Sequence, residues 1–412
     1  MTKKRKSTQS NTTRKRKSSK GNSSLSIRSI IVLLLLVGAM YLGERAGLIN
    51  VNWQAVLDGD FERALDSGQA VAGQQGAADF ASPQRVAVEP VSGEWYQLYF
   101  TSPQYPDEVG ARINTTAQGL VGVINNAQRS LDIAIYELDL PEVGDALLAA
   151  RDRGVTVRMV TDSDELEELE TLIRLEEAGI PIVPDERSPI MHNKFMVVDG
   201  EAVWTGSYNF TPNGTYRNNN NAIFIRSPQL AQNYATEFGE MFNEHAFGPT
   251  SPANTPYPQL QIGDTLVETC FAPEDECAEK LIATLDRAQA SIRFMAFSFT
   301  HDGLGAAIRD RAKAGVQVQG VFETRGSETE YSELGQMKQQ NLDVWQDGNP
   351  YTLHHKVFII DDKTVVLGSY NFSDNANEAN DENLLVVHNA EIAAQYLAEF
   401  QRVYQQAQNP PN

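Results

Sequence analysis

A pattern that occurs twice, at a nearly constant spacing, constrains the fold of this chain more than any other feature. Segments of the first half recur 161 or 162 residues later with the same residue types. The matched pairs are 127–138 with 288–299, 153–155 with 314–316, 192–194 with 354–356, and 206–209 with 368–371. Self-similarity at one offset indicates a duplicated domain. We therefore predict two copies, at 94–250 and 257–408, that pack face to face about a pseudo-twofold axis.

Within each copy, apolar runs alternate with helical patterns. Each copy has two strand candidates with a helical pattern between them, namely 131–136, 142–153 and 155–160 in the first copy, and 292–297, 303–314 and 316–322 in the second. Such alternation is typical of α/β units on a largely parallel sheet. The expected fold class is α/β, with two similar lobes, each a mixed β-sheet flanked by helices, related by a pseudo-twofold axis.

The chain before the repeat is organised differently. Residues 1–28 form a basic head with ten Lys and Arg and no acid, and residues 29–43 are an uncharged apolar run. As a helix this run would rise about 22 Å, less than the roughly 30 Å of a bilayer core but enough for a signal sequence. The basic side stays cytoplasmic by the positive-inside rule. We predict a signal anchor at 29–43, a flexible linker at 44–93, and a single-pass protein of the cell membrane with an extracytoplasmic body, or a secreted protein if the signal is cleaved.

The repeated body is strongly acidic. The formal net charge of the whole chain is −20, so removing the ten positive charges of the head leaves −30 on the remainder. Such a body repels polyanions at long range, and phosphate chemistry must then rest on a local basic pocket. The charge therefore disfavours a broad nucleic-acid-binding face.

The two cysteines, Cys270 and Cys277, are too few for a disulfide scaffold. Their spacing also lacks the second ligand pair of a structural zinc site. They form either one small-loop disulfide or two inert thiols. The predicted export into an oxidising compartment favours the disulfide.

The repeated pattern brings a histidine and a lysine together in each copy. His192 and Lys194 lie two residues apart at the start of a β-rich run, and His354 and Lys356 do the same in the second copy. Side chains two apart on a strand project from the same face. Each copy therefore directs one imidazole and one ammonium group into one space.

A hairpin signal follows the first of these runs. A two-residue turn at Asp199 would pair Lys194 with Thr205 and His192 with Ser207. This register would place the Gly-Ser-x-Asn corner at 206–209 beside the histidine and lysine. Asp199 lies an odd number of residues beyond Lys194, so we assign it a turn or orienting role.

These side chains suit phosphoryl chemistry without a metal or other cofactor. Lysine, serine and asparagine donors can hold a phosphoryl group while its bonds change. One imidazole can attack phosphorus while the other, protonated, donates to the departing alkoxide. The carboxylates around the motifs show no metal-ligand spacing, and we read the acidic run 162–170 as a solvated helix start.

The motif H-x-K-x4-D-x6-G-S-x-N, present twice, resembles that of the phospholipase D superfamily of phosphodiesterases. This resemblance covers about three quarters of the chain. It implies one composite site at the lobe interface and a covalent phosphohistidine, with His192 as nucleophile and His354 as general acid and then base. The implied phosphate ligands are Lys194, Lys356, Asn209 and Asn371. The remaining candidate residues are Asp199, Asp361 and Glu382 in the catalytic set and Ser207 and Ser369 in substrate binding.

The two copies differ at one position of the family pattern. Members often carry Asn-x-Glu after the motif, which Asn380-Asp-Glu382 fits, whereas the first copy has Asn218-Asn-Asn220. The carboxylate that could hold and polarise a histidine is thus present only once. We therefore expect the two halves to be chemically unequal.

The expected function is a phospholipase D acting on phospholipid head groups, because the chain has a membrane tether and an acidic body. One alternative is an extracytoplasmic, metal-independent nuclease acting on DNA or RNA. Another is a catalytically silent membrane-anchored scaffold. With both motifs in one chain, we expect a monomeric pseudo-dimer.

Overall fold

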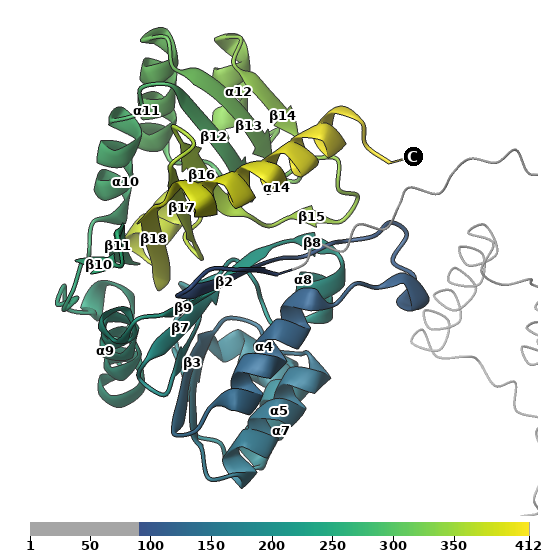
Figure 1. Ribbon diagram of the computed structural model, residues 1–412, viewed down its shortest axis with the longest axis vertical. Helices are drawn as coiled ribbons and strands as arrows, with labels where there is room; N and C mark the ends of the chain where they lie inside the picture. Colours follow the sequence, from purple (N-terminus) through teal and green to yellow (C-terminus); the bar gives the residue numbers. More distant parts are fainter. Residues whose placement is uncertain (1–89, 412) are drawn as a thin grey trace, which may run out of the picture. The chain divides into compact units, whose positions relative to one another are not determined.

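The computed structural model describes residues 90–411, which form two lobes of the same architecture (Figure 1). The first lobe contains β1 (Val91–Ser92), β2 (Tyr96–Phe100), α4 (Thr115–Asn126), β3 (Ser130–Ile135), α5 (Pro141–Asp152), β4 (Thr156–Thr161), α6 (Ser163–Glu168), α7 (Glu170–Glu177), β5 (Ile182–Pro184), β6 (Lys194–Val198), β7 (Ala202–Gly206), α8 (Pro212–Tyr216), β8 (Asn218–Asn219), β9 (Asn221–Arg226) and α9 (Pro228–Glu244). The second lobe contains β10 (Gln259–Ile262), β11 (Thr265–Ala272), α10 (Cys277–Asp286), β12 (Ser291–Ala296), α11 (Asp302–Lys313), β13 (Gln317–Phe322), α12 (Glu333–Gln339), β14 (Asp343–Gln346), β15 (Thr352–Leu353), β16 (Lys356–Ile360), β17 (Thr364–Gly368), α13 (Asp374–Glu378), β18 (Glu382–His388) and α14 (Ala390–Gln408).

Each lobe is built on an eight-stranded mixed sheet, as expected. The strand orders are β1-β2-β9-β7-β6-β3-β4-β5 and β10-β11-β18-β17-β16-β12-β13-β14. The sheets are less parallel than the alternation of strands and helices suggested. In the first lobe only β3, β4 and β5 pair in parallel, because helices connect them, whereas the pairs from β3 through β6, β7, β9 and β2 to β1 are antiparallel.

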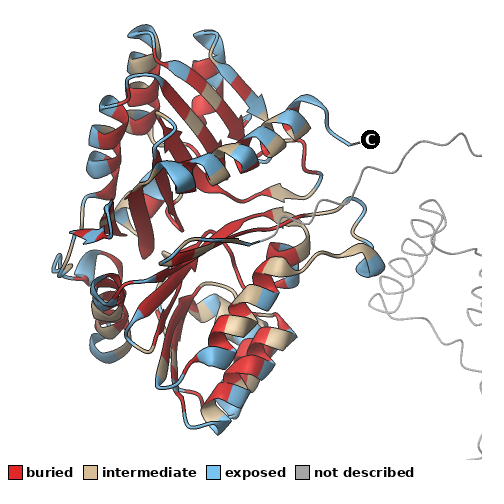
Figure 2. Ribbon diagram, in the orientation of Figure 1, coloured by how far each residue is buried: buried red, intermediate tan, exposed pale blue. Residues whose placement is uncertain are grey.

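Each lobe has a hydrophobic core of its own, and a third core is shared between the lobes. In the first lobe one core packs the sheet against α4, α5 and α7, and in the second lobe a matching core packs the sheet against α10, α11 and α12. The third core contains strands of both sheets together with α9 and α14. Figure 2 shows the buried strands between helices whose other faces are exposed. The shared core fixes the two sheets relative to each other, which a site made from both lobes requires.

The motif hairpin between β6 and β7 differs from the expected register by one residue. Val198 pairs with Ala202 and Phe195 with Thr205, because Glu201 is an extra residue on the second strand. The turn has positive φ at Asp199 (55°) and Gly200 (65°). A shift of one residue exchanges the faces of a strand. The expected pairings of Lys194 with Thr205 and of His192 with Ser207 are therefore wrong.

The lobes also meet through backbone pairing next to the motifs. β15 pairs in parallel with β8 across the interface, and Met191 forms a bridge with Asp381. These two contacts have equivalent positions in the duplicated chain, since each joins the residue before a motif histidine to the segment that follows the other motif. The expected pseudo-twofold relation is therefore present in the backbone at the interface.

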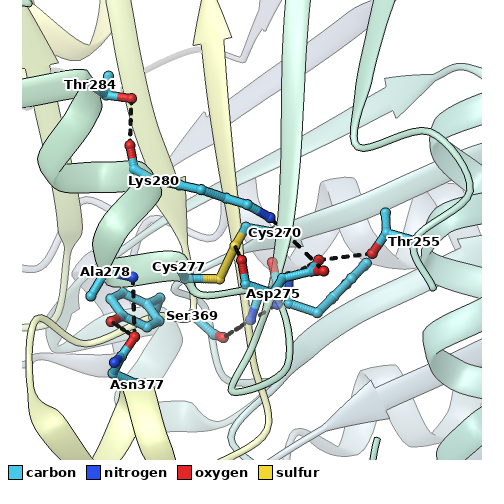
Figure 3. The surroundings of a disulfide bond; sticks show 12 residues. Thr255, Cys270, Asp275, Cys277, Ala278, Lys280, Thr284, Ser369 and Asn377 are labelled. Atoms are coloured by element: carbon cyan, nitrogen blue, oxygen red, sulfur yellow. Dashed lines mark hydrogen bonds and ion pairs between the residues drawn. A yellow bond between two sulfur atoms is a disulfide. The ribbon is translucent and has the colours of Figure 1, made fainter. Parts of the chain in front are cut away.

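Cys270 and Cys277 form a disulfide that joins β11 to the first residue of α10 (Figure 3). With a sequence separation of 7, this small loop adds roughly 2 to 3 kcal/mol in the chain-entropy model. Beside the bridge, the Ala278 backbone N–H donates to Asn377 Oδ1 (3.1 Å), and the Tyr370 hydroxyl donates to the same oxygen (3.0 Å). The bridged helix end is thereby fixed to the chain that follows the second motif.

The basic head, the apolar run at 29–43 and nearly all of the linker lie outside the described residues. The strand β1, at Val91–Ser92, lies within the last residues that we assigned to the linker. Among residues 90–411, no helix has the length and apolar character needed to cross a bilayer.

Candidate active site

Both motif histidines lie at the lobe interface, just before a buried strand. The His192 backbone N–H donates to the carbonyl of Asp381 (3.0 Å), and the His354 N–H donates to the carbonyl of Asn219 (3.0 Å). Each motif is therefore held by the backbone of the opposite lobe. Both imidazoles are almost completely buried.

His192 is paired with the single carboxylate that the sequence comparison singled out. Its Nδ1 lies 2.8 and 2.9 Å from the two oxygens of Glu382, which comes from the other lobe. Ser369 Oγ donates to the same carboxylate (2.6 Å). When Nδ1 donates to Glu382, Nε2 keeps its lone pair for chemistry.

His354 has a neutral partner in the equivalent position. Its Nδ1 donates to Oδ1 of Asn220, again from the opposite lobe, at 2.9 Å. Asn220 is oriented by the Ser207 hydroxyl, which donates to Oδ1 (2.9 Å), and by its own Nδ2, which donates to the Gly214 carbonyl (2.9 Å). The two histidines are thus equally well oriented, but only His192 is paired with an ionisable side chain.

The two lysines are fully buried beside the histidines. Nζ of Lys194 donates to the His192 carbonyl (2.7 Å), and Nζ of Lys356 donates to that of His354 (2.9 Å). Burial lowers the pKa of Lys194 to about 8, although Glu382 and Glu137 oppose this shift, and burial together with Lys194 lowers the pKa of Lys356 well below its usual value. Neither lysine forms an ion pair with any of residues 90–411, so the two buried amino groups provide the local basic pocket that the acidic body requires.

Burial and nearby charges also shift the pKa values of the two motif histidines and of Glu382. Burial and the charges of Lys194 and Lys356 lower the pKa of both His192 and His354 well below the usual value. Burial raises the pKa of Glu382 to about 8, although Lys194 and Ser369 act to lower it. Neutral imidazoles are therefore favoured at neutral pH until an anionic phosphoryl group offsets the lysine charges.

The motif asparagines lie in unlike surroundings. Nδ2 of Asn209 donates to Glu137 (2.6 Å), and its Oδ1 is buried with no partner among the described residues. Oδ1 of Asn371 is likewise buried without a partner there. Ser298 occupies the place of Glu137 in the second copy, so the two asparagines cannot be held in the same way.

The structure places four of the candidate residues away from the reacting groups or against their partners. Asp199 and Asp361 accept backbone N–H groups at 128–130 and 289–291, at the far ends of β6 and β16, which fits the turn role that we expected for Asp199. Ser207 and Ser369 are completely buried and donate to Asn220 and Glu382, so they orient the partners of the histidines. Catalysis by the two aspartates and substrate binding by the two serines stay predictions.

Sequence reasoning missed three residues of the site. The ring of Tyr136 lies 5.3 Å from that of His192, and Phe297 lies 4.8 Å from His354. Each ring also lies beneath a motif lysine. Both aromatic residues could have been identified from the sequence, because each follows one of the repeated strands and the two lie 161 residues apart. Glu137, the third, has no counterpart in the second copy and so gave no such signal.

One group of three carboxylates among the described residues lies close enough together to hold a metal ion: Glu237, Glu240 and Glu274. None is a motif residue. Burial and the charge of Glu274 raise the pKa of Glu240 to about 7. Because the folded chain then binds this proton more tightly than the unfolded chain, stability falls as the pH rises from 4.5 towards 7.

We therefore expect Glu240→Gln to raise the unfolding temperature more at pH 8 than at pH 5. At pH 8 the substitution removes a buried charge that repels its neighbours, whereas at pH 5 the native carboxyl is already neutral. Thermal unfolding at both pH values tests this. Glu177→Gln, at the exposed end of α7, is the control and should leave the difference between the two pH values unchanged. An equal shift at both pH values for Glu240→Gln would contradict the assignment.

Comparison with known proteins agrees with this geometry. The family model described as "Cardiolipin synthase, PLD-like domain" matches residues 120–242 and 281–404, once in each lobe. The phospholipase D of Rickettsia bellii is 31% identical over 159 residues, covering 38% of this chain and 79% of the relative. The mitochondrial cardiolipin hydrolase of Xenopus tropicalis is 35% identical over 127 residues, covering 31% of this chain and 60% of the relative.

A solved structure covers more of the chain. Phosphatidylserine synthase from Haemophilus influenzae superposes on 76% of this chain and 89% of its own, with a TM-score of 0.55 and 13% identity, and so shares the fold. The two ranges matched by the family model include both motifs. The duplicated domain, the composite histidine site and the family match show that this chain belongs to the phospholipase D superfamily of phosphodiesterase hydrolases.

Proposed function

We propose that this chain is a membrane-anchored, extracytoplasmic phospholipase D that hydrolyses the head-group phosphodiester of phospholipids through a phosphohistidine. The observation that carries the proposal is the unequal pairing of two buried imidazoles, His192 with Glu382 and His354 with Asn220. A phosphodiester requires one nucleophile and one acid, and the site offers one histidine suited to each task.

In the first step, Nε2 of His192 attacks phosphorus and forms a P–N bond. The P–O bond to the head group breaks, and the proton on Nε2 of His354 passes to the departing oxygen. In the second step, a water molecule gives its proton to His354 and attacks phosphorus, and the P–N bond breaks. The products are the free head-group alcohol and phosphatidic acid. Lys194 and Lys356 hold the charge of the phosphoryl oxygens throughout.

The partners of the histidines support this division of roles. The attacking histidine becomes positively charged in the intermediate, and the carboxylate of Glu382 stabilises that charge on His192. Asn220 offers His354 a dipole but no charge, so an imidazolium there is a stronger acid and releases its proton more readily. His192 is therefore the better nucleophile and His354 the better acid.

Three considerations favour a lipid substrate. Relatives at about 30% identity are named phospholipase D and cardiolipin hydrolase. The apolar run at 29–43 would hold the body at a membrane surface, and the charge of −30 outside the head repels polyanions. The deciding experiment offers the full-length chain phosphatidylcholine vesicles and plasmid DNA in parallel. Release of choline with intact plasmid is the expected result, whereas nicked plasmid without choline release would establish the nuclease alternative.

Membrane topology gives a further prediction. We expect protease added to intact cells that express the chain to degrade the body and leave the basic head protected, because positive charge keeps the head in the cytoplasm. Immunoblotting with tags at both ends reports which end survives. Full protection of both tags, with recovery in the cytosolic fraction, would refute the anchor.

Activity should also be independent of divalent metals. The proposed chemistry uses imidazole and ammonium groups in the places where a metal phosphodiesterase gathers carboxylates. We expect the rate of choline release to be unchanged in excess chelator. A loss that added Mg²⁺ or Zn²⁺ restores would show that this mechanism is wrong.

A further inference from the structure

Two buried carboxylates outside the motifs occupy equivalent positions in the two lobes. Asp162 follows the last residue of β4, and Glu323 follows the last residue of β13, 161 residues later. Both side chains are 2% exposed. Asp162 belongs to the acidic run that the sequence suggested was solvated, and its burial corrects that view.

Each carboxylate accepts two backbone N–H groups, one on each oxygen. Asp162 accepts from Asp164 (3.0 Å) and from Met191 (3.2 Å). Glu323 accepts from Arg325 (3.1 Å) and from Leu353 (2.6 Å). The pattern is the same in both lobes: one bond is local, and the other reaches about 30 residues along the chain.

The distant donor is in each case the residue directly before a motif histidine. Met191 precedes His192, and Leu353 precedes His354. These same two residues form the backbone pairing between the lobes. The segment that carries each imidazole is therefore held from the opposite lobe by the backbone and from its own lobe by a buried carboxylate.

Neither carboxylate has a lysine, arginine or histidine within ion-pair distance among residues 90–411. Like charges act on both carboxylates, Asp185 on Asp162 and Asp347 on Glu323. A buried charge near a like charge is costly unless its hydrogen bonds compensate it. The bonds from Met191 and Leu353 lower that cost, because each places a backbone N–H on a buried carboxylate oxygen.

We propose that Asp162 and Glu323 are positioning residues, the first for His192 and the second for His354. An amide in their place cannot do the same, because its NH₂ group would face one of the two N–H donors. One of the two hydrogen bonds must then break. When the broken bond is the one to Met191 or Leu353, the segment that carries the histidine is released. A misplacement of about 1 Å in a catalytic group costs roughly 100-fold in rate.

The test compares four single variants of the full-length chain: Asp162→Asn, Glu323→Gln, His192→Ala and His354→Ala. This test rests on the proposed function, and it uses two substrates that differ in leaving group, bis(p-nitrophenyl) phosphate and phosphatidylcholine. We expect each carboxylate variant to lose roughly 10- to 100-fold in kcat. The relative loss on the two substrates should resemble, in milder form, that of His192→Ala for Asp162→Asn and that of His354→Ala for Glu323→Gln. This pairing of variants is expected even if the two histidines exchange roles.

Asp185→Asn is the matched control. Asp185 is buried next to Asp162, but only one of its oxygens accepts a bond, from the Ser163 N–H (3.0 Å), and the other has no partner among the described residues. Its amide can therefore keep the contact, and kcat should stay near that of the wild type. An equal loss in Asp185→Asn and Asp162→Asn would overturn the proposal, as would identical substrate profiles for Asp162→Asn and Glu323→Gln.

A measurement that needs no activity separates this inference from the proposed function. In spectra of the full-length chain with labelled histidine, Asp162→Asn should shift the imidazole signal of His192 more than that of His354, and Glu323→Gln should do the reverse. Equal shifts, or none, in a folded protein would refute the positioning role. If the wild type cleaves neither substrate but the shifts follow this pattern, the proposed function fails and the inference stands.

Discussion

Replacement of His192 by Ala should abolish cleavage of every phosphodiester, whereas replacement of His354 by Ala should spare formation of the covalent intermediate when the leaving group needs no proton. Loss of a covalent nucleophile removes the reaction path, and an effect of at least roughly 10⁴-fold is expected. Loss of a general acid costs roughly 10² to 10⁴-fold with an alkoxide leaving group. With nitrophenolate, which departs without a proton, His354→Ala should still form the intermediate.

The measurement is rapid-quench trapping of acid-labile, base-stable phosphorus label on the protein during turnover of a nitrophenyl phosphodiester. Label should appear on the wild type, accumulate on His354→Ala, because the second step also needs a base, and be absent from His192→Ala. His355→Ala is the control, since the side chain of this neighbouring buried histidine bonds Asn221 and Glu399 and none of the reacting groups. Label on His192→Ala but not on His354→Ala would reverse the assignment, and no label on the wild type would contradict the covalent route.

The helices and strands could be predicted well from the sequence because the pattern of each occurs in both copies of the repeat. The candidate strands and helices lie within one residue of β3, β4, α5, β12, β13 and α11. A helix face such as that of α5, with Val143, Leu147 and Ala150 buried, is encoded by local spacing. The antiparallel half of each sheet was less evident, because strand pairing depends on contacts between distant segments.

The extra residue in the motif hairpin shows the limit of such reasoning at the site. Glu201 changes the register by one, and no local signal distinguishes a bulge from a two-residue turn with the same sequence. Asp199 also cannot reach the histidine, since the five residues of β6 lie between them and rise about 17 Å. The consecutive order of a motif therefore does not imply that its members share one site.

The partners of the histidines were hidden for a different reason. The sequence indicated that Glu382 has no equivalent in the first copy, but not that it serves the histidine of the first copy. This exchange depends on how the lobes dock, through β8 and β15 and the bridge at Met191. Contacts made only after two folded units meet leave no periodicity in either unit. The asymmetry could be predicted, but its assignment to His192 could not.

Glu382→Gln should lower kcat by roughly 10² to 10⁴-fold while the chain remains folded. The amide keeps an oxygen that can accept from His192 Nδ1. It cannot stabilise positive charge on the attacking imidazole, and it cannot enforce the tautomer in which Nε2 carries no proton. Removal of the carboxylate from a serine protease triad has an effect of this size for the same reason. The measurement is kcat on bis(p-nitrophenyl) phosphate together with the unfolding temperature.

Glu399→Gln provides a matched control, because Glu399 is also a buried carboxylate paired with a histidine. Its Oε1 accepts from His355 Nε2 (3.0 Å), and Arg402 bonds both of its oxygens, but none of these groups contacts the motif lysines or His192. This substitution leaves a partly buried guanidinium poorly paired, so it should lower the unfolding temperature more than kcat. Glu382→Gln should do the opposite, since its charge acts mainly in the reaction. If both variants lost stability and activity in the same proportion, Glu382 would be only a structural partner of His192. Its carboxylate would then not identify His192 as the nucleophile.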